Sequence, residues 1–211
     1  MNKQAMGLLT NQSLEGNIMR IEGIQFTNGI LTLRPYQITD IEPCFNAIRE
    51  SINELLPWMW WCHSTYSIKD TQIWIESRPG ACQNATECSF AIIDSKDGSF
   101  LGGCGLSNIN RTDRCANLGY WVRTSRSRQG VTPAAGLSVA RFAFKELELN
   151  RVEIVSATEN KASIRVAEKI GALREGTLRK RIVVRDTVYD AFMFSLIADD
   201  VREKPKKTSS A

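Results

Sequence analysis

The stretch Arg126–Ala140, RSRQGVTPAAGLSVA, decides the fold that we expect for this chain. The run LGYWV at Leu118–Val122 precedes it and has the character of a strand, whereas helical apolar spacing follows the turn. We expect Thr132 to be the helix N-cap, because its hydroxyl can accept a hydrogen bond from an orphan amide. Pro133 then suits the first helical position, where its missing N–H costs nothing. The stretch therefore predicts a strand, a tight cationic turn and a helix.

This turn is a candidate phosphate site. The free amides and the positive dipole end of the helix would meet the side chains of Arg126 and Arg128 where an anion can bind. The alternative is an ordinary strand-to-helix connection on a basic surface, and the residues of the turn alone leave both interpretations open.

Composition narrows the class of protein. A chain of 211 residues is long enough for about one domain with a real core, and 43% hydrophobic and 24% charged residues are typical of a globular protein. The net charge of +4 comes without a dominant basic stripe, so we expect no nucleic-acid partner. The sequence has no apolar run long enough for a bilayer and no signal-peptide pattern. We therefore expect a cytoplasmic protein without a membrane partner.

Cysteine spacing argues against a metal site. The six cysteines stand at 44, 62, 82, 88, 104 and 115, and no CxxC pair occurs among them. Zinc sites usually place their ligands in such close pairs, so we expect no metal here. Reduced and mostly buried thiols are the expectation for a cytosolic chain.

Apolar periodicity and turn signals predict an α+β fold in the order β-α-α-β-β-β-α-β-α-β-β. We expect a single domain over 21–199, with a mixed, mostly antiparallel central sheet and helices on both faces. The polar leader 1–20 is expected to be flexible, and the charged tail 200–211 to be disordered. The expected strands cover 29–37, 87–94, 99–110, 115–123, 151–158, 173–184 and 187–198. The expected helices run from Thr39 or Asp40 to 56, then over 68–80, 133–147 and 159–172.

The segment Leu56–Ser67, LPWMWWCHSTYS, gathers aromatic side chains and the single histidine, His63. Such a loop either folds onto the core or forms the wall of a binding cleft. In the second case it would bind substrate through Trp58, Trp60, Trp61 and Tyr66. His63 can titrate near neutral pH, so it is a candidate base as well as a candidate structural residue.

Several segments in this order resemble the GNAT superfamily of N-acetyltransferases. GYW stands before the cationic turn, and N-x-x-S stands before an -EKIGA- helix end. The chain is most similar to the Rim-type branch, which acetylates the N-termini of ribosomal proteins. The resemblance covers about Gly29 to Asp199. It rests on GILTLRP, LPWMWW, GYWVR, RQGVTPAA, LNRVEI, ENKASIRVAEKIGALREG and YDAFMFSL.

The resemblance implies that acetyl-CoA binds between two splayed parallel strands, with its pyrophosphate on the turn. It also implies that Ser163 protonates the leaving thiolate and that Asn160 bonds the pantetheine arm. The implied cofactor-binding residues are Leu118, Tyr120, Val122, Arg126, Arg128, Gln129, Gly130, Val131, Thr132, Pro133, Ala134, Asn160 and Ser163.

Three positions depart from the family pattern. Arg128 stands where the family turn has its first glycine, and there it either adds a phosphate contact or weakens the site. Its amide can serve if the backbone avoids positive φ. Asn117 replaces a glutamate that is the expected base in Rim relatives, and Ala167 stands where many members carry a tyrosine acid. The base is therefore unassigned, and its candidates are His63 through water, Glu87, Glu153, or loss of the ammonium proton by desolvation alone.

The resemblance implies direct attack of a primary amine on the acetyl thioester in a ternary complex. The acceptor stays open among a protein N-terminus, a free amino acid, a polyamine and an aminoglycoside. A non-catalytic acetyl-CoA-binding domain, used in sensing or assembly, is the alternative, and a homodimer stays open.

Overall fold

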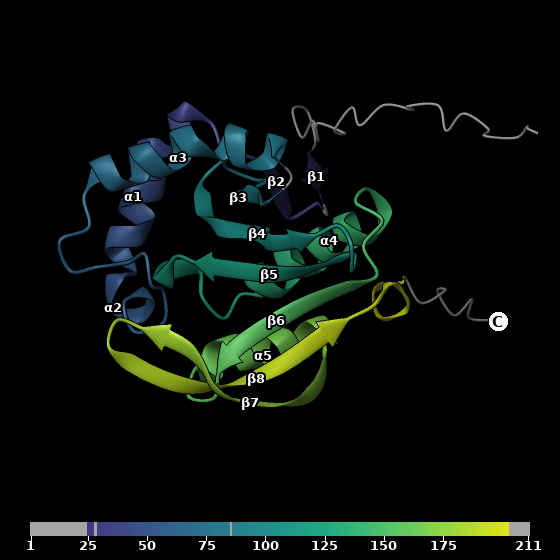
Figure 1. Ribbon diagram of the computed structural model, residues 1–211. Helices are drawn as coiled ribbons and strands as arrows, with labels where there is room; N and C mark the ends of the chain where they lie inside the picture. The colour runs from purple at the N-terminus through teal and green to yellow at the C-terminus, as the bar shows by residue number, and fades with distance from the viewer. Residues whose placement is uncertain (1–24, 28, 85, 203–211) are drawn as a thin grey trace, which may run out of the picture.

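The computed structural model describes residues 25–27, 29–84 and 86–202. An eight-stranded sheet forms its centre, in the order β1-β2-β3-β4-β5-β6-β8-β7 (Figure 1). The strands are β1 Phe26–Thr27, β2 Leu31–Pro35, β3 Cys88–Asp94, β4 Phe100–Asn110, β5 Cys115–Val122, β6 Arg151–Ala157, β7 Leu173–Val184 and β8 Thr187–Leu196. The helices are α1 Ile41–Glu50, α2 Ile52–Leu55, α3 Ile68–Gln83, α4 Val131–Lys145 and α5 Lys161–Ile170.

The sheet is mixed and mostly antiparallel, as predicted. Strands β1 to β5 pair antiparallel in sequence order, and β6, β8 and β7 form a second antiparallel set. The two sets are joined by the parallel pair β5–β6, because α4 carries the chain back over the sheet between them. This junction is the one place where parallel strands meet in the described part of the chain.

Helices cover both faces of the sheet, which β3 shows residue by residue. Phe90 and Ile92 belong to the core under α4, where Phe90 meets Phe142 edge-on at 5.4 Å. The alternating residues Ala91 and Ile93 belong to the second core, under α1 and α3. Alternation along a strand thus buries both faces of the central sheet.

The first predicted helix is divided. A 3₁₀ turn at Ile38–Asp40 comes first, and the chain breaks again at Ser51 between α1 and α2. Asp40 is the N-cap residue of α1, within the predicted start at Thr39 or Asp40, but its side chain makes no cap hydrogen bond to the helix. Its carboxylate instead accepts two hydrogen bonds of 2.7 Å from Arg34 and one of 2.8 Å from the amide of Gln37. The Asp40 carboxylate therefore pairs with Arg34 of β2 and makes no hydrogen bond to the helix.

The second predicted helix starts as expected and ends later. Asp70, in the first turn of α3, accepts hydrogen bonds from the amide and the hydroxyl of Ser67, the residue before the helix. The predicted end at Pro79–Gly80 is wrong, because α3 continues to Gln83. A proline removes only its own amide from the helical ladder, and the next turns bond normally, as from Asn84 N to the Gly80 carbonyl.

The fold extends slightly beyond Asp199. A 3₁₀ turn covers Ala198–Val201, Val201 is buried, and Arg141 donates from Nε to its carbonyl at 3.1 Å. Residues 200–202 are thus part of the fold, whereas the predicted leader 1–20 and the rest of the tail, 203–211, lie outside the described residues. Across the ranges that the structure describes, none of the helices is long and apolar enough to cross a membrane.

Candidate active site

The strands β5 and β6 separate partway along their length. Their parallel pairing joins Cys115–Asn117 to Arg151–Glu153 and stops there. Beyond Asn117, β5 stays paired with β4 as far as Val122, while β6 pairs with β8 (Figure 1). Within the described residues, the backbone groups of Leu118–Val122 that point away from β4 therefore have no strand to bond. Unpaired backbone groups need partners, and an extended ligand carrying amides can supply them.

The strand β5 leads directly to the start of α4. Gly130, in the left-handed region at φ 79°, is the N-cap, and the helix begins at Val131. The predicted Thr132 N-cap is wrong, and Pro133 is the third helical residue. The proline is still tolerated there, because the first amides of a helix have no intrahelical carbonyl to bond. No side chain caps this end.

The donors left at this turn are fewer than predicted. Pro133 has no N–H, and the Ala134 amide bonds the Gly130 carbonyl at 3.1 Å inside the helix. The amides of 128–132 are the remaining candidates to hold an anion. Arg128 has φ 62°, so it takes the left-handed backbone that glycine usually supplies, at a cost of about 1–2 kcal/mol. The sequence analysis expected the Arg128 amide to serve only if its φ were not positive, and the structure does not meet this condition. Arg128 instead takes the left-handed conformation of the glycine that it replaces, as Gly130 also does.

The side chains around the turn mostly contact protein. Arg126 lies 3.1 Å from the Asp94 carboxylate and 3.6 Å from that of Asp97, so its charge is already balanced. Gln129 donates to the Ser125 carbonyl at 3.1 Å. The guanidinium of Arg128 is exposed at the end of the helix.

The start of the turn is attached to α1. Arg123 donates two hydrogen bonds to the Glu50 carboxylate, which also accepts from the Ser125 amide at 2.7 Å. The Thr124 amide donates to the Ser51 hydroxyl at 2.9 Å. The Arg123 hydrogen bonds lower the pKa of Glu50 to about 2. The helix that leads to the aromatic segment thus also positions the turn.

A cavity of about 620 Å³ occupies the space between β4, β5, β6, the aromatic segment and the β7–β8 hairpin. Half of the predicted site residues line it together, whereas Val122 and the predicted residues of the turn 126–134 lie outside its lining. The lining includes Leu118, Tyr120, Asn160, Ser163, Trp58, Trp60, Trp61, His63 and Tyr66. The turn stands beyond this cavity, at the end of β5.

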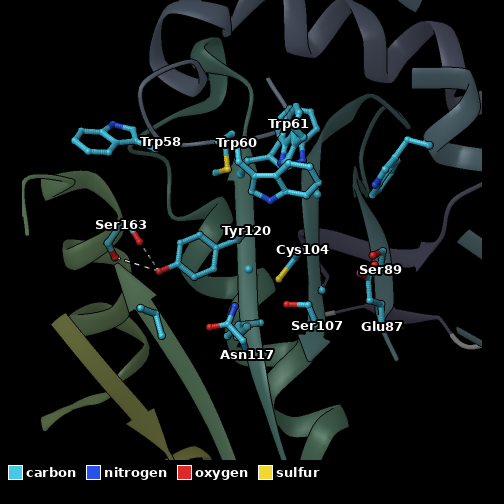
Figure 2. A pocket seen from close by; sticks show the side chains of 18 of the residues that line it. Trp58, Trp60, Trp61, Glu87, Ser89, Cys104, Ser107, Asn117, Tyr120 and Ser163 are labelled. Atoms are coloured by element: carbon cyan, nitrogen blue, oxygen red, sulfur yellow. Dashed lines mark hydrogen bonds between the residues drawn. The ribbon is translucent and has the colours of Figure 1, made fainter. Parts of the chain in front are cut away.

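Ser163 meets a tyrosine across the gap between the strands. The Tyr120 hydroxyl donates to the Ser163 carbonyl at 3.1 Å and lies 3.3 Å from the Ser163 Oγ (Figure 2). Burial raises the pKa of Tyr120, so its phenol stays protonated at neutral pH. Asn160 caps α5 by accepting from the Ser163 amide at 3.0 Å, so its carbonyl oxygen is already used. In the sequence, the only signal for this contact was the alternation of side chains along the strand-like run GYW, which contains Tyr120.

The aromatic segment serves both the core and the cavity. Trp61 and Tyr66 pack into the second core, and the Tyr66 phenol accepts from Thr71 at 3.1 Å. Trp60 is 79% exposed, whereas Trp58 lies against Tyr189 of β8 at 5.8 Å. The segment therefore contributes to the second core and also lines the cavity.

The tip of the β7–β8 hairpin closes this side of the cavity. Arg185 donates to the carbonyls of Leu56 and Cys62, each at 2.6 Å. Sequence reasoning missed this contact, because a turn arginine has no pattern that reveals a partner more than 120 residues away.

The candidate bases occupy different environments. His63 is about half exposed at the cavity rim, with Nδ1 3.0 Å from the Thr65 hydroxyl and Nε2 3.8 Å from Asp70. Glu87 lines the cavity and accepts from Arg78 Nη1 at 2.5 Å. Glu153 is bonded to Arg151 at 2.7 Å and is not a lining residue, so it is a poor candidate.

The fold and the cleft define a class of α+β proteins in which two parallel strands separate beside the uncapped N-terminus of a helix. The chain belongs to the acetyltransferase (GNAT) domain family, which it matches over residues 31–173.

Named relatives agree with this membership. A provisionally named ribosomal N-acetyltransferase of Bacillus subtilis strain 168, YdaF, is 31% identical over 81% of this chain and 92% of its own length. The ribosomal-protein-serine acetyltransferase of Escherichia coli K12 is 23% identical over 75% of this chain and 88% of its own length. The fold is shared with RimL, an L7/L12 alpha-N-protein acetyltransferase solved with coenzyme A, at a TM-score of 0.75 and 18% identity, covering 82% of this chain and 96% of RimL.

Proposed function

We propose that this protein transfers the acetyl group of acetyl-CoA to a primary amine. The observation that carries the proposal is the separation of β5 from β6 after Asn117, on the strand that leads to the uncapped start of α4. An acetyl-CoA molecule needs these two features together, because its pantetheine arm is extended and amide-rich and its pyrophosphate is strongly anionic. RimL, which shares the fold, was solved with coenzyme A.

The residues present fit acetyl-CoA. The free edge of Leu118–Val122 can bond the pantetheine amides as an added strand would. The amides of 128–132 form a concave, left-handed turn at the positive end of α4, which suits the pyrophosphate. The exposed Arg128 guanidinium can add a charged contact there, whereas Arg126 is held by two aspartates.

The chemistry needs no covalent enzyme intermediate. The amine nitrogen attacks the thioester carbon, a C–N bond forms, and the C–S bond breaks. Backbone donors of β5 at the gap can stabilise the negative charge that develops on the carbonyl oxygen. The Ser163 hydroxyl, held near the Tyr120 phenol, supplies a proton to the leaving sulfur, and the proton that the nitrogen loses as the amide forms restores this hydroxyl. Binding both substrates in one cleft supplies the proximity that drives the attack.

A protein N-terminus is the acceptor that we favour. YdaF and the Escherichia coli relative both carry ribosomal substrates in their names. The cavity of about 620 Å³ has the size of ordinary ligand pockets and is walled by Trp58, Trp61 and the β7–β8 hairpin. A flat-sided aromatic wall suits the first residues of a peptide chain.

Calorimetry followed by a transfer assay tests the proposal. We expect acetyl-CoA to bind, and coenzyme A to be released when ribosomal-protein N-terminal peptides are added. The amine panel also contains free amino acids, a polyamine and an aminoglycoside, so that it identifies the acceptor class. A protein that neither binds acetyl-CoA nor releases coenzyme A with any amine contradicts the proposal.

A non-catalytic acetyl-CoA-binding role is the second candidate. Asn117 cannot accept a proton where Rim-type relatives carry a glutamate, and Arg128 occupies a glycine position of the turn. Tight acetyl-CoA binding without turnover on every amine of the panel would favour this role over catalysis.

A further inference from the structure

A polar row crosses three neighbouring strands on the cavity side of the sheet. Ser107 of β4 stands opposite Asn117 of β5, and Cys88 stands opposite Leu106. Glu87, directly before Cys88, therefore lies beside Ser107 in the next position of the register. All three side chains line the cavity, as Figure 2 shows for the labelled Glu87, Ser107 and Asn117.

Asn117 brings an unsatisfied acceptor to one end of this row. Its Oδ1 is buried and accepts no hydrogen bond from the described residues. A buried carbonyl oxygen in a polar cavity calls for a donor, and both an ammonium group and a water molecule can supply one. Because Asn117 is the last residue of β5 that pairs with β6, this acceptor lies at the point where the two strands separate.

Glu87 brings a carboxylate to the other end. Arg78 of α3 donates to Glu87 Oε2 and is itself fixed by the Trp74 carbonyl, the Ser77 hydroxyl and the face of the Trp74 ring. Within the described residues, Glu87 Oε1 accepts no such bond, so it is available to a water molecule. The side chain is 41% exposed, so a proton that it receives can leave to solvent.

The other ionisable groups around Glu87 are poor proton acceptors. Burial raises the pKa of Tyr36, which follows β2, well above its ordinary value, and raises the pKa of the Cys104 thiol on β4 to about 12. Tyr120 on β5 is likewise held neutral by burial. Arg78 on α3 is a cation. The second carboxylate in the cavity lining, Asp70, is occupied at the rim by the Ser67 amide and hydroxyl.

We infer that Glu87 finally accepts the proton that the substrate amine loses. Water held between Asn117 and Ser107 carries this proton to Glu87. This inference rests on the proposed acetyl transfer. The ammonium group gives its proton to the water chain, the chain delivers a proton to Glu87 Oε1, and the neutral amine forms the C–N bond as the C–S bond breaks. The nitrogen loses its second proton as the amide forms. That proton restores the Ser163 hydroxyl, whose own proton goes to the leaving sulfur. Neighbouring strands lie about 4.8 Å apart, so Asn117 on β5 and Glu87 beside β3 are separated by two such spacings, roughly 10 Å, which a short chain of about two or three water molecules spans.

The test compares the pH dependence of kcat/KM for the whole chain and its Glu87→Gln variant, with a peptide acceptor. In the parent protein we expect an acidic limb on which kcat/KM rises with pH. In Glu87→Gln we expect kcat/KM to fall at least about 100-fold and this limb to be lost, while acetyl-CoA binding by calorimetry is unchanged. Glu87→Asp should recover part of the rate and the limb.

Matched controls separate this role from a structural one. Glu175→Gln also removes a carboxylate paired with an arginine, but outside the cavity lining, and should keep the parent profile. A Glu87→Gln variant that keeps the limb and loses no more than a few-fold in kcat/KM overturns the inference. The inference is also overturned if the acidic limb of kcat/KM disappears in His63→Gln and not in Glu87→Gln. A parent protein that neither binds acetyl-CoA nor acetylates any amine refutes the proposed function, and with it this inference.

Discussion

Glu50 at the end of α1 offers a test of how the phosphate turn is held. Its carboxylate accepts two hydrogen bonds from Arg123 and one from the Ser125 amide, at the point where the chain leaves β5. These contacts lower the pKa of Glu50 from 4.5 to about 2. The substitution Glu50→Gln keeps the size of the side chain and removes the charge that Arg123 pairs with.

The cost follows from the kind of contact that is lost. Hydrogen bonds to a charged group contribute about 1.5–3 kcal/mol when the group is shielded from water. The side chains of Arg123 and Glu50 are 27% and 28% exposed, so solvent screening favours the lower part of that range. We expect Glu50→Gln to lower the free energy of unfolding by about 1.5–2 kcal/mol at pH 7.

The pH dependence of this difference has a definite sign. A carboxyl group whose pKa is lower in the folded protein stabilises the fold above its ordinary pKa, and it loses this effect as the pH falls. The window therefore extends from about 4.5 down to about 2. The difference between the parent protein and Glu50→Gln should be constant above about pH 5.5 and should shrink as the pH falls through this window.

Urea unfolding at pH 7 and pH 4 measures the effect, and calorimetry with acetyl-CoA at pH 7 reports on the turn. Glu42→Gln is the matched control, because Glu42 is an exposed glutamate on the same helix. We expect the control to match the parent protein in both measurements, and Glu50→Gln to bind acetyl-CoA more weakly. Equal stability of Glu50→Gln and the parent protein at pH 7 would refute the reasoning.

Three further changes give separate tests. Arg128→Glu should weaken acetyl-CoA binding by about 1.5–3 kcal/mol, measured by calorimetry, and an unchanged affinity would remove this side chain from the site. Ser163→Ala should lower turnover and leave acetyl-CoA binding nearly intact, whereas an unaffected rate would end its role as the acid. Gly105→Ala should destabilise the fold by about 1–3 kcal/mol in urea unfolding, because the added Cβ would lie 2.5 Å from the Cys88 carbonyl oxygen. Gly176→Ala is its control, since a Cβ there meets nothing within 4 Å, and equal losses in both variants would count against the argument from crowding.

Much of the architecture could be predicted because its signals are local. Alternating apolar residues identified β2, and Gly171 marked the end of α5, where it takes φ 91°. The parallel pairing of β5 and β6 agrees with the pair of parallel strands that the family resemblance implied, and a single helix, α4, connects the two. These features depend on residues close together in the chain, so the sequence pattern contains them.

The errors arose where a distant partner overrode a local preference. Aspartate is a typical N-cap residue, but the Arg34 guanidinium on β2 binds the Asp40 carboxylate. Proline usually ends a helix, but α3 continues past Pro79 to Gln83. Thr132 and Pro133 suggested a helix start, but the left-handed Gly130 moved that start to Val131.

By itself the sequence determined the order of elements, the family resemblance and the place of the cationic turn at Arg126–Ala134. Those follow from periodicity, from turn chemistry and from short motifs along the chain. The tertiary structure alone decided which side chains the turn leaves for a ligand, since Arg126 is held by Asp94 and Asp97 while Arg128 is exposed. It also brought Tyr120 to Ser163, and Glu87 into one row with Asn117. Such contacts join strands and helices far apart in the chain, and they exist only once the sheet has set its register.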